Sequence, residues 1–268
     1  LLVGLSAAKA LAYARGLPLV TVDHIEAHVH AGTMEHPRDA GSYPCAALVV
    51  SGGHTALYRV ESPLEMELVA TTLDDAAGEA FDKVAWLLGL PYPGGPAIAR
   101  LALEGDRRRF DFPRCRVKAA SRAAPSFSFS GLKTAVLYHL RGQNALAPTP
   151  APESIPDRAD VAASFQEAVV DSLVEPTLAA ALELGLERVL VVGGVACNQR
   201  LRERMAEASQ AAGLTARFPS PAYCTDNAAM IAGLGWHLLR AGRTAALDAD
   251  ASAHRDERAA GSRSGWRG

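Results

Sequence analysis

The chain is poor in cysteine and in aromatic residues, and it has almost no net charge. Of its 268 residues four are cysteine and 6% are aromatic, and the formal net charge is -2. The cysteines, at positions 45, 115, 197 and 224, are spaced too widely for a CxxC zinc knuckle or redox pair. Scattered cysteines of this kind are typical of a reducing compartment. A charge near zero excludes a global basic field, so any nucleic-acid surface must be local.

Long hydrophobic runs are missing as well. No apolar stretch approaches the roughly 20 residues that span a membrane, and no basic leader precedes the apolar segment 1–14. We therefore expect a cytoplasmic protein without membrane contact. The chain begins with Leu1 rather than Met and enters a helical pattern at once, so we expect that the natural N-terminal segment is missing. Hydrophobic residues make up 49%, enough for a sizeable core.

Apolar runs and helical periodicities alternate along the chain, which predicts an α/β fold. Proline and glycine separate them in loops at 32–44, 91–96 and 143–156. Pro176 is expected to kink or split its helix. The predicted strands are 17–22, 46–50, 55–60 and 188–192. The predicted helices are 1–14, one beginning at 23, 74–88, one ending at 103, 160–184, 198–212 and 226–239.

His24 and His28 form the sharpest local signal. Residues four apart share a helix face, so both imidazoles can reach one metal ion. The alternative is two surface histidines near a helix start. Glu26 falls on the opposite face, and we favour a capping box with Asp23 for it over the role of a peptidase base. A third ligand is needed; Asp226 is a candidate, and its alternative role is that of a helix cap.

Two glycine turns follow predicted strands. Ser51–Thr55 lies in a hairpin, and Gly193-Gly194 joins a strand to a helix. Such turns bring backbone N–H groups close to an anion. Each alone is equally compatible with a plain turn. Together they resemble the actin/sugar-kinase superfamily, which holds a nucleotide between two lobes.

Charged residues gather in two further segments. In the helix predicted at 74–88, Asp75, Glu79 and Asp82 share a face, so Lys83, a ligand hydroxyl or a metal must offset their charge. The alternative is a solvated helix start. Segment 107–122 carries seven basic residues against one acid, Asp111, and is either a phosphate-binding surface or a solvated loop. Four phenylalanines accompany it, at positions 110, 112, 127 and 129.

Six motifs in order resemble one family, the bacterial TsaD-type tRNA N6-adenosine threonylcarbamoyltransferases, formerly called O-sialoglycoprotein endopeptidases. They are HIEAHVHA, LVVSGGHTALYRV, DDAAGEAFDKVAWLLGLPYPGGP, FSFSGLKTAV, VLVVGGVACNQRLRERM and YCTDNAAMIAGLGW. The resemblance implies a two-lobed actin-like, ribonuclease H-like fold with its first lobe truncated at the N-terminus. By this resemblance, residues 1–44 are a remnant of the first lobe and residues 45–226 form the second lobe. Residues 227–248 form a helix that returns to the first lobe, and residues 249–268 are a disordered tail.

The resemblance also implies a reaction. A threonylcarbamoyl group moves from threonylcarbamoyl-AMP to N6 of the adenosine adjacent to the anticodon in tRNAs that read codons beginning with A, and AMP is released. The implied metal is Fe²⁺ or Zn²⁺, held by His24, His28 and Asp226; the implied nucleotide is threonylcarbamoyl-AMP or ATP, ADP or AMP. The implied partners are tRNA, a paralogous TsaB-type subunit and a TsaE-type ATPase.

The substrate-binding positions implied by the resemblance are Val49, Val50, Ser51, Gly52, Gly53, Asp82, Gly95 and Asn198. The general base is unassigned, with Glu79 and His54 as candidates. Under this resemblance, the basic segment is expected to contact the tRNA backbone. The residues concerned are Arg107, Arg108, Arg109, Arg114, Arg116 and Lys118.

This sequence departs from the family at two small residues. Ala27 replaces a usual Gly, and Cys197 a common Ala. The family's first phosphate loop is also not found, so we expect the fragment alone to be inactive. The alternatives are an actin-superfamily ATP-dependent phosphotransferase, a non-catalytic partner subunit, which would lack the His pair, and a metallopeptidase, which would need a base that this spacing does not supply.

Overall fold

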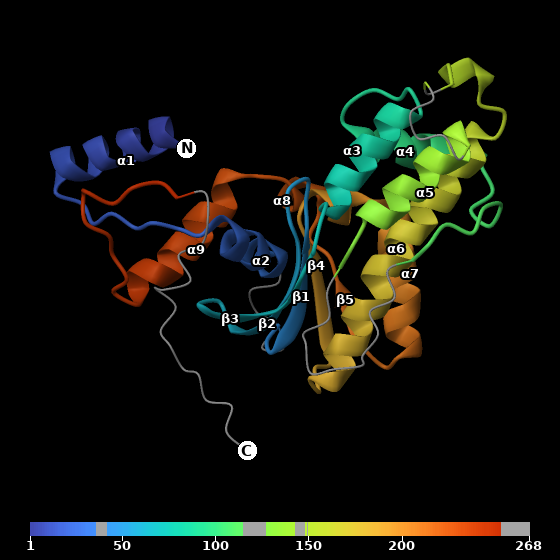
Figure 1. Ribbon diagram of the computed structural model, residues 1–268. Helices are drawn as coiled ribbons and strands as arrows, with labels where there is room; N and C mark the ends of the chain where they lie inside the picture. Colours follow the sequence, from blue (N-terminus) through green and yellow to red (C-terminus); the bar gives the residue numbers. More distant parts are fainter. Residues whose placement is uncertain (36–41, 115–126, 143–147, 149, 253–268) are drawn as a thin grey trace.

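A five-stranded sheet forms the centre of the molecule in the computed structural model, which describes residues 1–35, 42–114, 127–142, 148 and 150–252. The strand order is β3-β2-β1-β4-β5 (Figure 1). β1 pairs antiparallel with β2 and parallel with β4, and β4 pairs parallel with β5. The strands are β1 (Cys45–Val50), β2 (Thr55–Ser62), β3 (Glu65–Thr71), β4 (Arg188–Val192) and β5 (Thr215–Arg217). This confirms the predicted α/β class.

β1 and β4 are central because nearly every side chain on them is apolar. All six residues of β1 are buried, as expected of a strand that is covered on both faces. On one face Val49 and Val192 pack with Val29 of helix α2 (His24–Met34). On the other, Leu48 and Val191 belong to the main core. That core includes much of helix α6 (Arg158–Glu183).

The remaining helices surround this sheet, with α3, α4, α5 and α7 on the side of α6 and α9 on the side of α2 (Figure 1). Helix α1 projects from the body, and of its residues only Ala12 is buried. These helices are α1 (Leu2–Arg15), α3 (Ala77–Leu87), α4 (Gly94–Leu101), α5 (Ser130–Arg141), α7 (Gln199–Ala211), α8 (Pro221–Cys224) and α9 (Ala228–Arg240). Short 3-10 turns are η1 (Ala102–Glu104), η2 (Pro152–Ser154) and η3 (Gly194–Cys197).

Several predicted elements need correction. Segment 17–22 is not a strand; it makes one isolated bridge, from Leu19 to Ala245, because it runs beside the end of α9 and away from the sheet. The loop predicted from residue 32 begins later, since α2 continues to Met34. Pro176 does not split α6, which stays one helix because its burial in the core outweighs the lost hydrogen bond.

Two helices start later than predicted, and both displaced starts affect the site. α3 begins at Ala77, since the Asp75 carbonyl accepts a hydrogen bond from the Thr72 hydroxyl and stays outside the helix. α9 begins at Ala228, after an N-cap at Asn227.

The lobe boundaries stay predictions, and residues 253–268 of the expected tail lie outside the described residues. Within the described residues, no helix combines the length and the apolar character that crossing a bilayer requires.

Gly193, directly after β4, is fixed by its backbone geometry. Its φ of 93° lies in a region that side chains disfavour, and a Cβ there would lie 2.3 Å from the Val50 carbonyl oxygen. The neighbouring Gly194 has open space around it and no positive φ. The end of β1 and the turn after β4 can therefore touch only through a residue without a side chain.

We predict that Gly193→Ala lowers the free energy of unfolding by about 2 kcal/mol or more, from backbone strain and the clash with Val50. Gly194→Ala is the matched control and should change it by less than about 0.5 kcal/mol. Urea denaturation of both variants measures the difference. Equal stabilities would contradict the close approach.

Candidate metal centre and adjoining glycine turns

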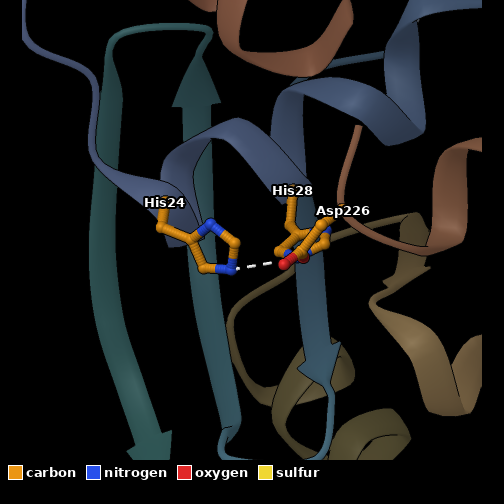
Figure 2. Close-up of side chains that lie close together, drawn as sticks. All are labelled: His24, His28 and Asp226. Carbon is orange, nitrogen blue, oxygen red and sulfur yellow. Dashed lines mark hydrogen bonds and ion pairs between the residues drawn. The ribbon is translucent and has the colours of Figure 1, made fainter. Parts of the chain in front are cut away.

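His24, His28 and Asp226 converge on one point at the start of α2 (Figure 2). The Asp23 carboxylate caps this helix by accepting the Glu26 N–H at 2.9 Å, as the capping-box pattern predicts. The Asp226 carboxylate oxygen Oδ1 lies 3.1 Å from His28 Nε2 and 3.5 Å from His24 Nε2. The three ligand atoms lie within 4.8 Å of one another. Two imidazoles and one carboxylate are a donor set that suits iron or zinc.

Of the two histidines, His28 is buried, whereas His24 is 50% exposed, so only His24 matches the alternative of a surface residue. The His28 side chain is 2% exposed, and its Nδ1 has no hydrogen-bond partner. Burial lowers the pKa of His28, and the nearby His24 lowers it further, against the opposing effect of Asp226. The neutral imidazole is the form that can donate a lone pair to a metal.

Asp226 is available as a ligand because another residue caps the following helix. The Asn227 side chain accepts the Met230 N–H at 2.9 Å, so the alternative role of Asp226 as the helix cap is wrong. The Asp226 side chain is 77% exposed. The centre is thus closed by protein behind His28 and open to solvent at Asp226.

The first glycine turn lies between β1 and the N-terminus of α3. The Gly78 N–H donates to the Ser51 carbonyl at 3.2 Å, and the Ala77 N–H donates to the Thr55 hydroxyl at 2.9 Å. A Cβ on Gly78 would lie 2.6 Å from that carbonyl oxygen, which explains the small residues at this helix start. Helix α3 therefore directs its positive end at the turn.

The turn also lies near the metal-ligand candidates. His54 is close enough for its charge to lower the pKa of His28. Ser51, Gly52 and Gly53 are at the surface of the turn, whereas Val49 and Val50 are buried in β1. A ligand at this edge would meet the turn directly, and the two valines only through their backbone.

Asp82 and Gly95 lie where α3 meets α4. The Asp82 carboxylate accepts the Gly94 N–H at 2.7 Å and so fixes the start of α4 beside α3. Gly94 is tightly enclosed, since a Cβ there would lie 2.7 Å from the Asp82 Cα. Gly95 has open space around it. Of the two glycines, only Gly95 leaves room for a ligand.

Asn198 is held at both ends of its amide. Its oxygen caps α7 by accepting the Leu201 N–H at 3.0 Å, and its nitrogen donates to Gln166 Oε1 at 2.8 Å. Gln166 is buried in α6 and was not singled out from the sequence. Its one sequence signal is a polar residue within an otherwise apolar helical stretch.

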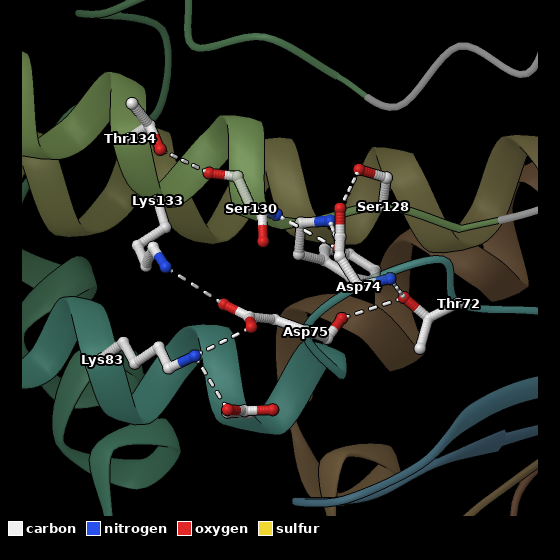
Figure 3. Close-up of polar contacts among 10 residues, drawn as sticks. Thr72, Asp74, Asp75, Lys83, Ser128, Ser130, Lys133 and Thr134 are labelled. Atoms are coloured by element: carbon white, nitrogen blue, oxygen red, sulfur yellow. Dashed lines mark hydrogen bonds and ion pairs between the residues drawn. The ribbon is translucent and has the colours of Figure 1, made fainter.

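The acidic residues around α3 are paired with lysines (Figure 3). Lys83 lies 2.8 Å from both Asp75 and Glu79, and Lys133 lies 3.4 Å from Asp75. Burial raises the pKa of Asp75, but the two lysines outweigh it and hold the pKa below its usual value. Lys83 thus offsets the charges of Asp75 and Glu79, but it does not pair with Asp82.

Asp74 caps α5 from outside that helix. Its carboxylate accepts the backbone N–H groups of Phe129 at 2.8 Å and Ser130 at 3.3 Å, and the Ser128 hydroxyl (Figure 3). The prediction that Asp75, Glu79 and Asp82 share one helix face is wrong, since Asp75 precedes α3. Asp75 and Glu79 pair with Lys83, whereas Asp82 accepts the Gly94 N–H.

The basic segment contains both exposed arginines and an arginine that forms ion pairs with carboxylates. Arg107, Arg108 and Arg109 are exposed. Arg114 instead lies 2.8 Å from Asp111 and 2.8 Å from Asp171, which also pairs with Arg204 at 3.2 Å. Arg116 and Lys118 lie outside the described residues.

This segment borders an open cleft of about 530 Å³ between it, α6 and α7. Phe112, Phe127 and Phe129 are buried in the core, and Phe110 packs against His139 at a tilt, with ring centroids 4.3 Å apart. The aromatic residues of the segment thus support packing more than they offer an exposed stacking surface.

Comparison with known proteins assigns the family. Residues 1–233 match the profile of the TsaD family, tRNA N6-adenosine threonylcarbamoyltransferase. The chain belongs to this family. Proteins named tRNA N6-adenosine threonylcarbamoyltransferase from Syntrophotalea carbinolica and Geobacter sulfurreducens are 51% and 53% identical to it over 251 residues. Each alignment covers 94% of this chain and 70% of the relative. The family's members are transferases that modify tRNA, so this chain is an enzyme of that class.

Solved structures support the fold of this family member. Full-length HypF in a phosphate- and nucleotide-bound form superposes with a TM-score of 0.62 at 14% identity, over 87% of this chain and 45% of that one. HypF of T. kodakarensis gives 0.58 at 16% identity, over 88% and 39%. The chain thus spans less than half of either HypF. The ribonuclease H-like α/β fold expected from the resemblance is confirmed.

We predict that Asp171→Ala lowers the free energy of unfolding by about 2 kcal/mol, because it leaves two half-buried arginines without their shared acceptor. Asp111→Ala is the control, since that carboxylate is 97% exposed and touches the same Arg114. It should cost less than about 0.5 kcal/mol. Urea denaturation compares the two, and a larger effect at Asp111 would contradict this reading.

Proposed function

We propose that this chain transfers a threonylcarbamoyl group from threonylcarbamoyl-AMP to N6 of the adenosine adjacent to the anticodon, in tRNAs that read codons beginning with A. The observation that carries the proposal is the convergence of His24, His28 and Asp226 beside a glycine turn that a helix N-terminus faces. A metal ion and a phosphate binding side by side there suit a mixed carbamate–phosphate anhydride.

The metal part of the site rests on the donor set. His24, His28 and Asp226 would hold Fe²⁺ or Zn²⁺, and the convergence of these ligand atoms together with the lowered His28 pKa fits a cation better than a proton. A bound ion would supply Lewis-acid polarisation of the threonylcarbamoyl carbonyl. The exposed side of Asp226 leaves this group an approach from solvent.

The nucleotide part of the site lies at the carboxyl end of β1 and β4. The N–H groups of Gly52 and Gly53 would hold the AMP phosphate, and the positive end of the α3 dipole would favour its charge. Asp82 would accept a hydrogen bond from a ribose hydroxyl, as acidic residues do in dinucleotide sites. Asn198, fixed by Gln166, and the open Gly95 would contact the nucleoside.

In the transfer, the adenosine N6 attacks the carbonyl carbon, a C–N bond forms, and the C–O bond to phosphate breaks. AMP leaves with the electron pair, and N6 loses one proton. His54 and Glu79 are the candidates to accept this proton. Glu79 is paired with Lys83, whereas His54 is exposed beside the turn, so the geometry favours His54. Positioning of the two substrates should supply much of the rate.

The partners follow from this chemistry. A tRNA would reach the open side of the metal centre, and the exposed Arg107, Arg108 and Arg109 would contact its backbone. A TsaB-type subunit and a TsaE-type ATPase are the proposed protein partners, and a tRNA substrate places the reaction in the cytoplasm. The phosphotransferase and partner-subunit alternatives leave the histidine pair unused.

We predict that the purified chain takes up about one Zn²⁺ or Fe²⁺, in line with a single three-ligand site. The double variant His24→Ala/His28→Ala should lose the bound ion, because the Asp226 carboxylate is the one ligand of the three that remains. His54→Ala is the matched control, an exposed nearby histidine outside the three donors, and should keep the ion. Elemental analysis after dialysis measures the content. Metal retained in the double variant, or none in the wild type, would overturn the site.

We predict a transfer rate at least about 100-fold lower for His28→Ala than for the wild type, from loss of carbonyl polarisation and orientation. The assay contains this chain, the two partner proteins, unmodified tRNA and threonylcarbamoyl-AMP, and mass spectrometry of digested tRNA detects the modified nucleoside. Arg243→Ala, on the segment after α9, is the control and should keep the wild-type rate. Full activity of His28→Ala would contradict the mechanism.

A further inference from the structure

A pair of cysteines lies next to the proposed site and takes no part in it. Cys197 ends η3, and Cys224 ends α8. Cys197 lies close enough to Cys224 to raise the pKa of its thiol, in addition to the larger effect of burial. Cys197 is exposed and Cys224 is buried.

Arg202 independently places the two segments together. Its Nε donates to the Ala196 carbonyl at 2.6 Å, directly beside Cys197. Its Nη2 lies 3.3 Å from the Cys224 sulfur and also donates to the Pro219 carbonyl at 2.8 Å. One guanidinium therefore holds η3, the Cys224 sulfur and the approach to α8 in a single arrangement. Of the two thiols, the exposed Cys197 is the one that an oxidant in solution can reach, and Arg202 holds the buried Cys224 sulfur beside that segment.

We propose that Cys197 and Cys224 form a dithiol that peroxides oxidise to a disulfide. The Cys197 sulfur attacks one peroxide oxygen; an S–O bond forms, the O–O bond breaks, and water leaves with the thiol proton. Cys197 is thereby oxidised to a sulfenic acid and the peroxide is reduced. The Cys224 sulfur then attacks the Cys197 sulfur, an S–S bond forms, and the S–O bond breaks. The departing oxygen takes the Cys224 proton and leaves as a second water.

The position of this bond gives it a consequence beyond the two thiols. Asn198 follows Cys197 directly and caps α7, and Asp226 follows Cys224 after one residue. A disulfide would join these two segments covalently, between the proposed nucleotide side and the proposed metal side. The inference goes beyond the proposed function, and its test requires no transfer activity.

The test treats the purified chain with a small excess of hydrogen peroxide and measures its intact mass. The wild type should lose two hydrogen atoms, and a thiol reductant should restore them. Trypsin cuts after arginines 188, 200, 217 and 240, so the two cysteines fall in separate peptides, 189–200 and 218–240, that remain linked only by the disulfide.

Cys197→Ala is the first variant, since an exposed side chain can be shortened without loss of the fold. It should not form the linked peptides, nor should Cys224→Ser. Cys115→Ser controls for a cysteine outside the described residues and should form them like the wild type. Linked peptides that involve Cys115 or Cys45, a wild-type chain with all four thiols still alkylated after peroxide, or a Cys197 carrying two or three oxygens would each overturn the proposal.

Discussion

The contact between the end of β1 and the turn after β4 is the constraint on which the rest of the site depends. Because these strands are parallel neighbours, both glycine turns leave the sheet at the same edge. Gly193 approaches the Val50 carbonyl so closely that no side chain fits, and Gly78 approaches Ser51 in the same way from α3. The absence of side chains at these two points brings two turns and a helix N-terminus together at one edge of the sheet, where the proposed phosphate site lies.

The three metal-ligand candidates reach this edge through helix packing on one face of the sheet. α2 lies on β1 and β4 through Val29, which fixes where His24 and His28 point. α9 packs closely against α2, since a Cβ on Gly233 would lie 2.7 Å from His30 Nε2. The loop that carries Asp226 follows α8, and the N-cap residue of α8, Ser220, anchors it by donating its N–H to Glu35 at 2.6 Å. Asp226 is thus positioned by α2 and by its own neighbours.

These contacts also explain what could be predicted from the sequence. The four-residue spacing of His24 and His28 is a local property of a helix, so their common face followed from periodicity alone. Asp226 lies 198 residues from His28, and no spacing rule reaches that far; it came from the resemblance to the family. The buried partners Gln166 and Asp171 were missed, because a polar residue in an apolar helix does not reveal which distant side chain it meets. The strand predicted at 17–22 was wrong for a similar reason. A β-branched run forms a strand only where the edge of a sheet is available to pair with it, and the local sequence does not reveal this.

The unequal exposure of the three metal-ligand candidates bears on how the site works. His28 is 2% exposed, whereas the side chains of His24 and Asp226 are 50% and 77% exposed. A buried neutral imidazole is a fixed ligand, because burial disfavours its protonated form and packing limits its rotation. The more exposed pair has room to adjust, and the proposed substrate group would approach the centre from their side. A centre built with one rigid and two accessible ligands can hold its ion firmly on the protein side and still present open positions to a substrate arriving from solvent.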